Sequence, residues 1–194
     1  MASLRVTAGS LRSRRVPVPP GDLRPTSERA RQAFFNIVGK RIDRAQFLDL
    51  FAGSGIFAFE AVSRGAASAT AVDHDRRKIE SIAKLANEWD APVNAVRGEV
   101  MGTIKRLRER FDVIYADPPY DFDAYDALVE AIGTLSLAED AVIAVEHRRR
   151  TDPFHERPAG LKPSRRAEYG EVWITFFEAS GVGRQASGGG GSEA

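Results

Sequence analysis

The segment Ala116-Asp117-Pro118-Pro119-Tyr120 places a carboxylate, a backbone carbonyl and an aromatic ring close together in the chain. It follows a short apolar run over residues 111–115, which predicts a buried strand. Two adjacent prolines end that strand, because neither has an N–H for the ladder and both restrict φ. Asp117 and the Pro118 carbonyl could each accept one N–H of a planar amino group, while Tyr120 could stack on its ring. The segment therefore suits an aromatic amine.

The same segment also has an ordinary structural interpretation. The sequence Asp-Pro-Pro is common in turns, and the tyrosine after it could simply pack against the protein. The choice between the two interpretations depends on what the rest of the chain places beside this corner.

An alternation of strands and helices occupies the middle of the chain. Strands are expected at 47–51, 69–72, 93–96, 111–116 and 141–145, and helices at 54–64, 76–89, 100–110 and 125–134. Repeated βα units with short connections predict an α/β fold, in which helices cover both faces of a mostly parallel sheet. Residues 165–168 and 172–177 flank a Tyr-Gly-Glu turn and predict an antiparallel hairpin at the sheet edge.

The N-terminal part alternates loosely over residues 4–20, which predicts a short two-stranded arm too small for a core of its own. A helix of about three turns should follow, capped by Thr26 or Ser27. Its apolar stripe is Ala30, Ala33, Phe34, Ile37 and Val38. Off that stripe, and so expected to face solvent or a ligand, lie Arg29, Arg31 and Gln32. We expect a basic arm over 1–22, one domain over 23–178 and a disordered tail over 179–194.

The composition excludes several classes of protein. The chain has no cysteine, so disulfides and thiolate metal sites are absent, and its three histidines make no metal-ligand spacing. We therefore expect no metal. No apolar run is long enough to span a membrane, and the N-terminus lacks the apolar core of a signal peptide. The expected location is the cytoplasm.

The net charge of +1 conceals a strong asymmetry. Residues 1–31 hold seven arginines against two acidic residues, and residues 148–166 hold seven basic residues against two acidic ones. The remainder has 14 basic and 23 acidic residues. Two separate basic segments favour a positive face that binds nucleic acid over a solvated arm without a partner.

The expected strand ends carry further polar groups. Asp49 and Phe51 precede the Gly53-Ser54-Gly55 turn, whose glycines permit a sharp bend and close approach of a ligand. This turn also fits a dinucleotide-binding fold, whereas a Walker loop is excluded because no Gly-Lys-Ser/Thr follows. At the next strand ends, Asp73 could accept the ribose hydroxyls of an adenosine, and Glu99 could meet its amino group.

This order of motifs resembles the class I S-adenosylmethionine-dependent methyltransferases that act on exocyclic amino groups. More closely, the chain resembles the bacterial family that methylates a guanine 2-amino group in small-subunit ribosomal RNA. The resemblance covers residues 4–178 and is strongest at 23–31 (LRPTSERAR), 48–55 (LDLFAGSG), 60–65 (EAVSRG) and 116–120 (ADPPY). The chain departs from the family near Ala8-Gly9 and at Arg12-Ser13-Arg14-Arg15, where relatives usually carry Gly-Gly and Arg-Gly-Arg.

The resemblance implies a Rossmann-like fold with a seven-stranded sheet, S-adenosylmethionine as cofactor, and ribosomal RNA in an assembling small subunit as partner. The residues it implies for catalysis are Asp117, Pro118 and Tyr120. Those implied for the cofactor are Thr26, Asp49, Phe51, Gly53, Gly55, Asp73, His74, Glu99 and Asp117. For His74, a surface position without a ligand is an equal alternative. Those implied for RNA are Arg12, Arg14, Arg15, Arg24, Arg148 and Arg149.

Other functions remain open from the sequence. A methyltransferase of another RNA or DNA base would use a similar corner, although the chain lacks an extra domain to identify a DNA sequence. A protein-glutamine methyltransferase usually has Asn in place of Asp117. A nucleotide-dependent oxidoreductase or a non-catalytic RNA-binding protein would belong to a different class.

Overall fold

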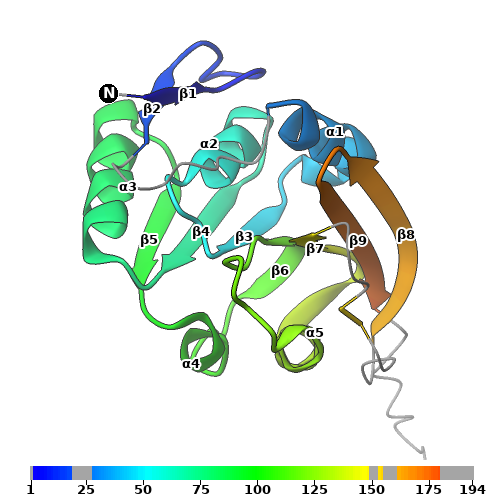
Figure 1. Cartoon of the computed structure of the whole chain (residues 1–194). Helices are drawn as coiled ribbons and strands as arrows, with labels where there is room; N and C mark the ends of the chain where they lie inside the picture. Colours follow the sequence, from blue (N-terminus) through cyan, green and yellow to red (C-terminus); the bar gives the residue numbers. More distant parts are fainter. Residues whose placement is uncertain (1, 19–27, 149–152, 155–160, 180–194) are drawn as a thin grey trace, which may run out of the picture.

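A seven-stranded sheet with strand order β5-β4-β3-β6-β7-β9-β8 forms the centre of the computed structural model, which describes residues 2–18, 28–148, 153–154 and 161–179 (Figure 1). Its parallel strands are β3 (Gln46–Leu50), β4 (Ser68–Asp73), β5 (Val93–Arg97), β6 (Arg110–Ala116) and β7 (Ser136–Arg148). The antiparallel hairpin is β8 (Leu161–Tyr169) and β9 (Val172–Ala179). The predicted fold class is confirmed.

Helices cover both faces of the sheet (Figure 1). One face carries α1 (Glu28–Val38), a short 3₁₀ helix η1 (Gly39–Ile42), α2 (Ile56–Ser63) and α3 (Arg76–Trp89), and the other carries α4 (Val100–Ile104) and α5 (Tyr125–Gly133). Successive side chains of a strand point to opposite faces. Phe47 and Leu48 of β3 accordingly lie in the two different hydrophobic clusters, both fully buried.

The N-terminal arm consists of β1 (Ser3–Arg5) and β2 (Arg15–Pro17), paired antiparallel as expected. It lies against the outer side of α2 and α3 (Figure 1). Its apolar residues Val6, Leu11 and Val16 are buried in the same cluster as the helices, so the arm has no separate core. The predicted boundary between residues 22 and 23 falls outside the described residues, as do Thr26, Ser27 and residues 180–194 of the predicted tail.

Three predicted element bounds were wrong by four residues or more. The helix expected over 100–110 ends at Ile104, and the last of those residues, Arg110, already belongs to strand β6. Strand β7 begins at Ser136, and not at 141, because residues 136 and 137 also pair with β6, ahead of a register shift at which β7 carries extra residues. Strand β8 begins at Leu161, four residues before the expected start, and continues the ladder with β9.

The predicted orientation of α1 was also partly wrong, because Arg31 is fully buried. Its Nη2 donates to the Arg5 carbonyl at 2.8 Å, and its Nε lies 3.6 Å from Glu60 Oε2. Burial lowers the pKa of Arg31, and the Glu60 carboxylate opposes that shift. The partner carboxylate explains how a charged side chain can replace an apolar one on the packed face. Arg29 is exposed, as expected.

No helix in the described part of the chain is both long and apolar enough to cross a bilayer. Over the same residues, no three His, Cys, Asp or Glu side chains gather in a way that could hold a metal ion.

Candidate active site at the strand ends

The loop after β3 has an unusual backbone. Phe51, Gly53 and Gly55 all have positive φ, at 62°, 55° and 78°. A Cβ on Gly55 would lie 2.8 Å from Ile82 of α3, so both the backbone angle and the close helix require glycine there. For Phe51 this conformation costs roughly 1–2 kcal/mol, and such strain is concentrated at ligand sites. Its ring contacts Phe122, with centroids 5.5 Å apart.

Asp73 ends β4 and joins this loop to the start of α3. Its Oδ2 accepts a hydrogen bond from the Gly53 N–H at 2.9 Å, and its Oδ1 accepts one from the Asp75 N–H at 2.9 Å. Lys78 Nζ lies 3.9 Å from Oδ2. Each carboxylate oxygen can accept a further hydrogen bond, so these contacts leave capacity for ligand hydroxyls. The exposed His74 ring lies beside it, with Nδ1 3.6 Å from Oδ1.

Asp49 lies beneath the same loop and is 2 % exposed. Burial raises its pKa to about 8; the hydrogen bond from the Ala58 N–H (3.2 Å) opposes this shift, and the Asp73 carboxylate adds to it. A carboxyl group with this pKa is largely protonated at pH 7 unless a cation lies nearby. A positively charged group close to Asp49 would stabilise its ionised form.

Glu99 follows β5 and occupies the position before α4. Its side chain is exposed and does not cap the helix, while its backbone carbonyl accepts the Thr103 N–H at 2.8 Å. The carboxylate is thus held by its backbone at the same edge of the sheet as Asp73, whose strand pairs with β5 up to Arg97.

The Asp117 corner is tied to the end of β3. The Asp117 N–H donates to the Leu50 carbonyl at 3.2 Å, which places the corner directly beside the strained loop. Pro118 is buried, and among the described residues no backbone amide donates to its carbonyl. The Phe122 N–H closes the turn onto the Pro119 carbonyl at 3.0 Å. Tyr120 beyond it is 51 % exposed.

The guanidinium group of Arg148 lies over the face of the Tyr120 ring. The Arg148 guanidinium carbon lies 3.5 Å from the ring centroid. This contact shows that the face of Tyr120 is accessible to a flat group of that size. Arg148, which was expected to bind RNA, ends β7 and stands at the mouth of the Asp117 corner.

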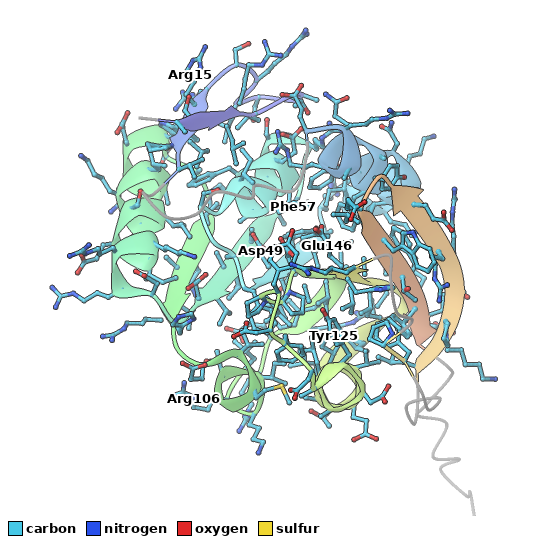
Figure 2. The ribbon with its side chains drawn as sticks, in the orientation of Figure 1. Arg15, Asp49, Phe57, Arg106, Tyr125 and Glu146 are labelled. Carbon is cyan, nitrogen blue, oxygen red and sulfur yellow. The ribbon has the colours of Figure 1, made fainter. Side chains whose placement is uncertain are left out.

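Sequence reasoning missed a polar cluster behind this corner. The Tyr115 hydroxyl donates to the buried Glu146, and Tyr115 stacks on Phe57 with centroids 3.8 Å apart. Figure 2 labels Phe57 and Glu146 among the side chains of the fold. Burial raises the pKa of Tyr125 to about 12, with the Asp117 and Glu146 carboxylates adding to that shift. A signal was present for Glu146, since it follows the apolar run 141–145 as Asp117 follows 111–115.

Comparison with known proteins identifies the family of this chain. The family described as "Conserved hypothetical protein 95" matches residues 4–178. This chain belongs to that family.

Relatives of the chain are named methyltransferases. It is 37 % identical to the ribosomal RNA small subunit methyltransferase D of Escherichia coli (strain K12) over 150 residues, and this alignment covers 74 % of each protein. It is 30 % identical over 185 residues to the putative rRNA methyltransferase YlbH of Bacillus subtilis (strain 168), covering 92 % of this chain and all of that one. The solved structure of the putative methyltransferase yhhF from Escherichia coli has a TM-score of 0.81, 29 % identity and coverage of 92 % and 98 %.

The family assignment confirms the predicted methyltransferase fold and enzyme class. The structure brings Gly53, Asp73, Glu99 and Asp117 to one edge of the sheet. It places Arg12, Arg14 and Arg15 on the exposed surface of the arm. Three residues of the predicted site lie outside the described residues, and these are Arg24, Thr26 and Arg149.

Proposed function

We propose that this enzyme transfers a methyl group from S-adenosylmethionine to the 2-amino group of a guanine in small-subunit ribosomal RNA. The observation that carries the proposal is the hydrogen bond from Asp117 N–H to Leu50, which fixes the amine-binding corner beside the cofactor loop. The similarity to a ribosomal RNA small subunit methyltransferase supports the RNA substrate. We further propose that the substrate is an assembling small subunit in the cytoplasm.

The donor groups at the strand ends fit this cofactor. The buried Asp49 favours a nearby positive charge, such as the ammonium or sulfonium group of S-adenosylmethionine. Asp73 has capacity for the ribose hydroxyls, and the exposed Glu99 has capacity for the adenine amino group. Phe51, Gly53 and Gly55, together with His74 and Thr26, complete the proposed cofactor set. When bound, S-adenosylmethionine supplies an electrophilic methyl group.

The enzyme's own task is to orient a weak nucleophile. The lone pair of an aromatic amine is delocalised into its ring, so alignment contributes more than base strength. Asp117 and the Pro118 carbonyl accept the two N–H bonds and turn the lone pair toward the cofactor loop. Because a carboxylate is a weak base, we assign hydrogen bonding to Asp117 ahead of proton removal.

The target guanine must leave its stack to enter the corner. Tyr120 then stacks on the base, and Arg148 moves from the ring toward an RNA phosphate. Further phosphates are contacted by the basic residues of the arm and of the segment after β7, which are Arg12, Arg14, Arg15, Arg24 and Arg149.

The proposal is tested with tritiated S-adenosylmethionine and small ribosomal subunits from cells that lack this enzyme. The labelled nucleoside is identified by mass spectrometry after complete digestion of the RNA. Label in guanine methylated on its 2-amino group is the expected result. Label in adenine or in ribosomal protein alone would overturn the assigned substrate while retaining the methyltransferase fold.

A further inference from the structure

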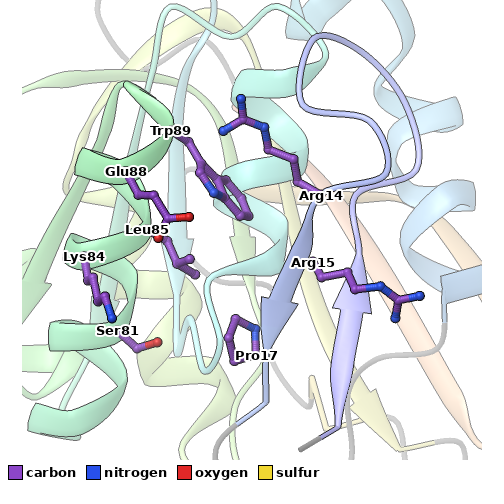
Figure 3. A pocket seen from close by; sticks show the side chains of 8 residues that line it. All are labelled: Arg14, Arg15, Pro17, Ser81, Lys84, Leu85, Glu88 and Trp89. Atoms are coloured by element: carbon purple, nitrogen blue, oxygen red, sulfur yellow. The ribbon is translucent and has the colours of Figure 1, made fainter.

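A groove of about 590 Å³ lies between the N-terminal arm and α3, apart from the strand-end site (Figure 3). Arg14 and Arg15 of the arm form one wall, and Lys84, Glu88 and Trp89 of α3 are on the other. Three cations against one carboxylate make the groove electropositive. An electropositive groove that also contains an aromatic ring is characteristic of sites for single-stranded nucleic acid.

The aromatic floor of the groove is firmly supported. Trp89 is partly exposed and packs on Phe59 beneath it, with ring centroids 4.9 Å apart. The Arg14 guanidinium carbon lies 5.3 Å from the centroid of Trp89. Trp89 therefore already binds one flat cationic group, and a nucleobase can use the same surface by stacking.

The wall made by the arm is held in place by α2. The Thr7 N–H donates to Glu60 Oε2 at 2.8 Å, and the Ser10 N–H donates to the Ser63 carbonyl at 2.8 Å. Gly9 lies so close that a Cβ there would stand 1.6 Å from the Ser63 carbonyl oxygen. Because these contacts fix the arm, Arg14 and Arg15 are held at the edge of the groove before any ligand arrives.

The groove is remote from the methyl-transfer corner. Helix α3 begins directly after Asp75 at the strand ends and has 14 residues, so it is about 20 Å long. Trp89 is the last residue of that helix, at the far end from Asp73. A ligand in the groove is thus separate from a base in the Asp117 corner.

We propose that this groove binds a single-stranded segment of the RNA substrate away from the methylated guanine. One base stacks on Trp89, and Arg14, Arg15 and Lys84 contact the phosphates on either side. The inference rests on the proposed function for the identity of the RNA. The groove is distinct from the strand-end site, so the inference can be disproved while the proposed function stands. It adds Trp89 and Lys84, which no strand-end motif predicts, to the RNA-binding surface.

The first test uses Trp89 as its own probe. The chain has two tryptophans, so Trp173→Phe leaves Trp89 as the single tryptophan, which can be excited at wavelengths too long for the four tyrosines. A short single-stranded oligoribonucleotide should quench that fluorescence with saturation, whereas inorganic polyphosphate, which has charge but no bases, should not. No quenching by RNA, or equal quenching by both, would overturn the proposal.

The second test reverses one exposed charge. Lys84→Glu should weaken RNA binding and reduce the slope of log affinity against log salt by about 0.7, because one phosphate contact to a single strand is lost. The matched control is Lys105→Glu, an exposed lysine at the end of α4 on the opposite face of the sheet. Cofactor affinity should stay unchanged in both variants, which shows that each is folded.

The outcomes separate the two proposals. If the wild-type enzyme methylates ribosomal RNA but Lys84→Glu behaves like Lys105→Glu, the groove does not bind RNA and the proposed function stands. If the wild-type enzyme transfers no methyl group to RNA, the proposed function fails, and the fluorescence of Trp89 still decides whether the groove binds RNA.

Discussion

The Gly53 N–H donates to Asp73 Oδ2 at 2.9 Å, so one hydrogen bond joins the loop after β3 to the end of β4. The same carboxylate accepts the Asp75 N–H and thereby also fixes the start of α3. Loss of Asp73 should loosen the loop as well as remove a ligand group. Its effect on cofactor binding should therefore exceed that of a single ligand contact.

Asp73→Ala should weaken S-adenosylmethionine binding by at least about tenfold, since hydrogen bonds to charged groups contribute roughly 1.5–3 kcal/mol. Isothermal titration calorimetry measures the change. The control is Asp112→Ala, which removes a carboxylate that accepts the Gln46 N–H at 2.7 Å where β3 begins. Equal losses of affinity in both variants would show that Asp73 has no specific role.

Asp49 should make the stability of the ligand-free enzyme depend on pH. Its pKa is about 8 in the fold and near 3.8 when unfolded, so the folded state holds the extra proton between these values. The contribution of Asp49 to the free energy of unfolding therefore falls as pH rises, by up to about 1.4 kcal/mol per pH unit, and levels off above pH 8. Asp49→Asn should lack this component.

Urea denaturation of the wild type and of Asp49→Asn at pH 5, 7 and 9 checks this sign. The amide retains an oxygen for the Ala58 N–H. The contributions of the other titrating groups cancel when the free energies of unfolding of the two proteins are subtracted. The variant should gain stability relative to the wild type as pH rises. A constant difference over the three pH values would contradict a protonated Asp49.

Glu60 should be a major source of stability because it is a buried centre of charge. It accepts hydrogen bonds from the Thr7 N–H and from Arg64 Nε, both at 2.8 Å, and pairs with the buried Arg31. Glu60→Ala leaves Arg31 uncompensated, so we expect a loss of about 3–5 kcal/mol in the free energy of unfolding.

The matched control is Glu80→Ala. Glu80 accepts from Arg76 Nε at 2.7 Å with the same four-residue spacing, but both side chains are exposed. Water screens such a pair, so its removal should leave stability nearly unchanged. Similar midpoints of urea denaturation for the two variants would show that the burial of Glu60 does not affect the stability of the fold.

Gly9→Ala should displace the arm without harming the cofactor site. Its Cβ would overlap the Ser63 carbonyl, whereas Gly39→Ala also introduces a side chain at positive φ, at 58°, with nothing within 4 Å. We expect Gly9→Ala alone to raise KM for the RNA substrate and to expose the arm to limited proteolysis. Identical proteolysis and KM in the two variants would contradict a fixed arm.

Much of the fold could be predicted because the strands and helices follow from the local spacing of apolar residues. The five parallel strands follow from apolar runs, and the polar residues after them meet at one edge as a consequence of parallel pairing. Asp73 and Asp117 were identified in this way, and Asp49 from its place ahead of the glycine turn. Glu146 follows the apolar run 141–145 and carries a similar signal, but it lies outside the motifs that carry the family resemblance.

The remaining features depend on contacts between distant segments. Arg31 is buried because Glu60, from another helix, compensates its charge, and a helical stripe counted from apolar residues alone cannot show that. The groove at Trp89 exists only because the arm packs on α2 and α3, which brings Arg14 beside a residue 75 positions later. The left-handed Phe51 also follows from the fold and not from its residue type.

The most direct test of the account measures methyl transfer and cofactor affinity together in Asp117→Ala. Misplacement of the amino group should reduce single-turnover methyl transfer to small ribosomal subunits by at least about a hundredfold. Affinity for S-adenosylmethionine should stay within a few-fold, as in the exposed control Asp140→Ala. Near-normal turnover in Asp117→Ala would contradict the central claim that the Asp117 corner orients the guanine amine.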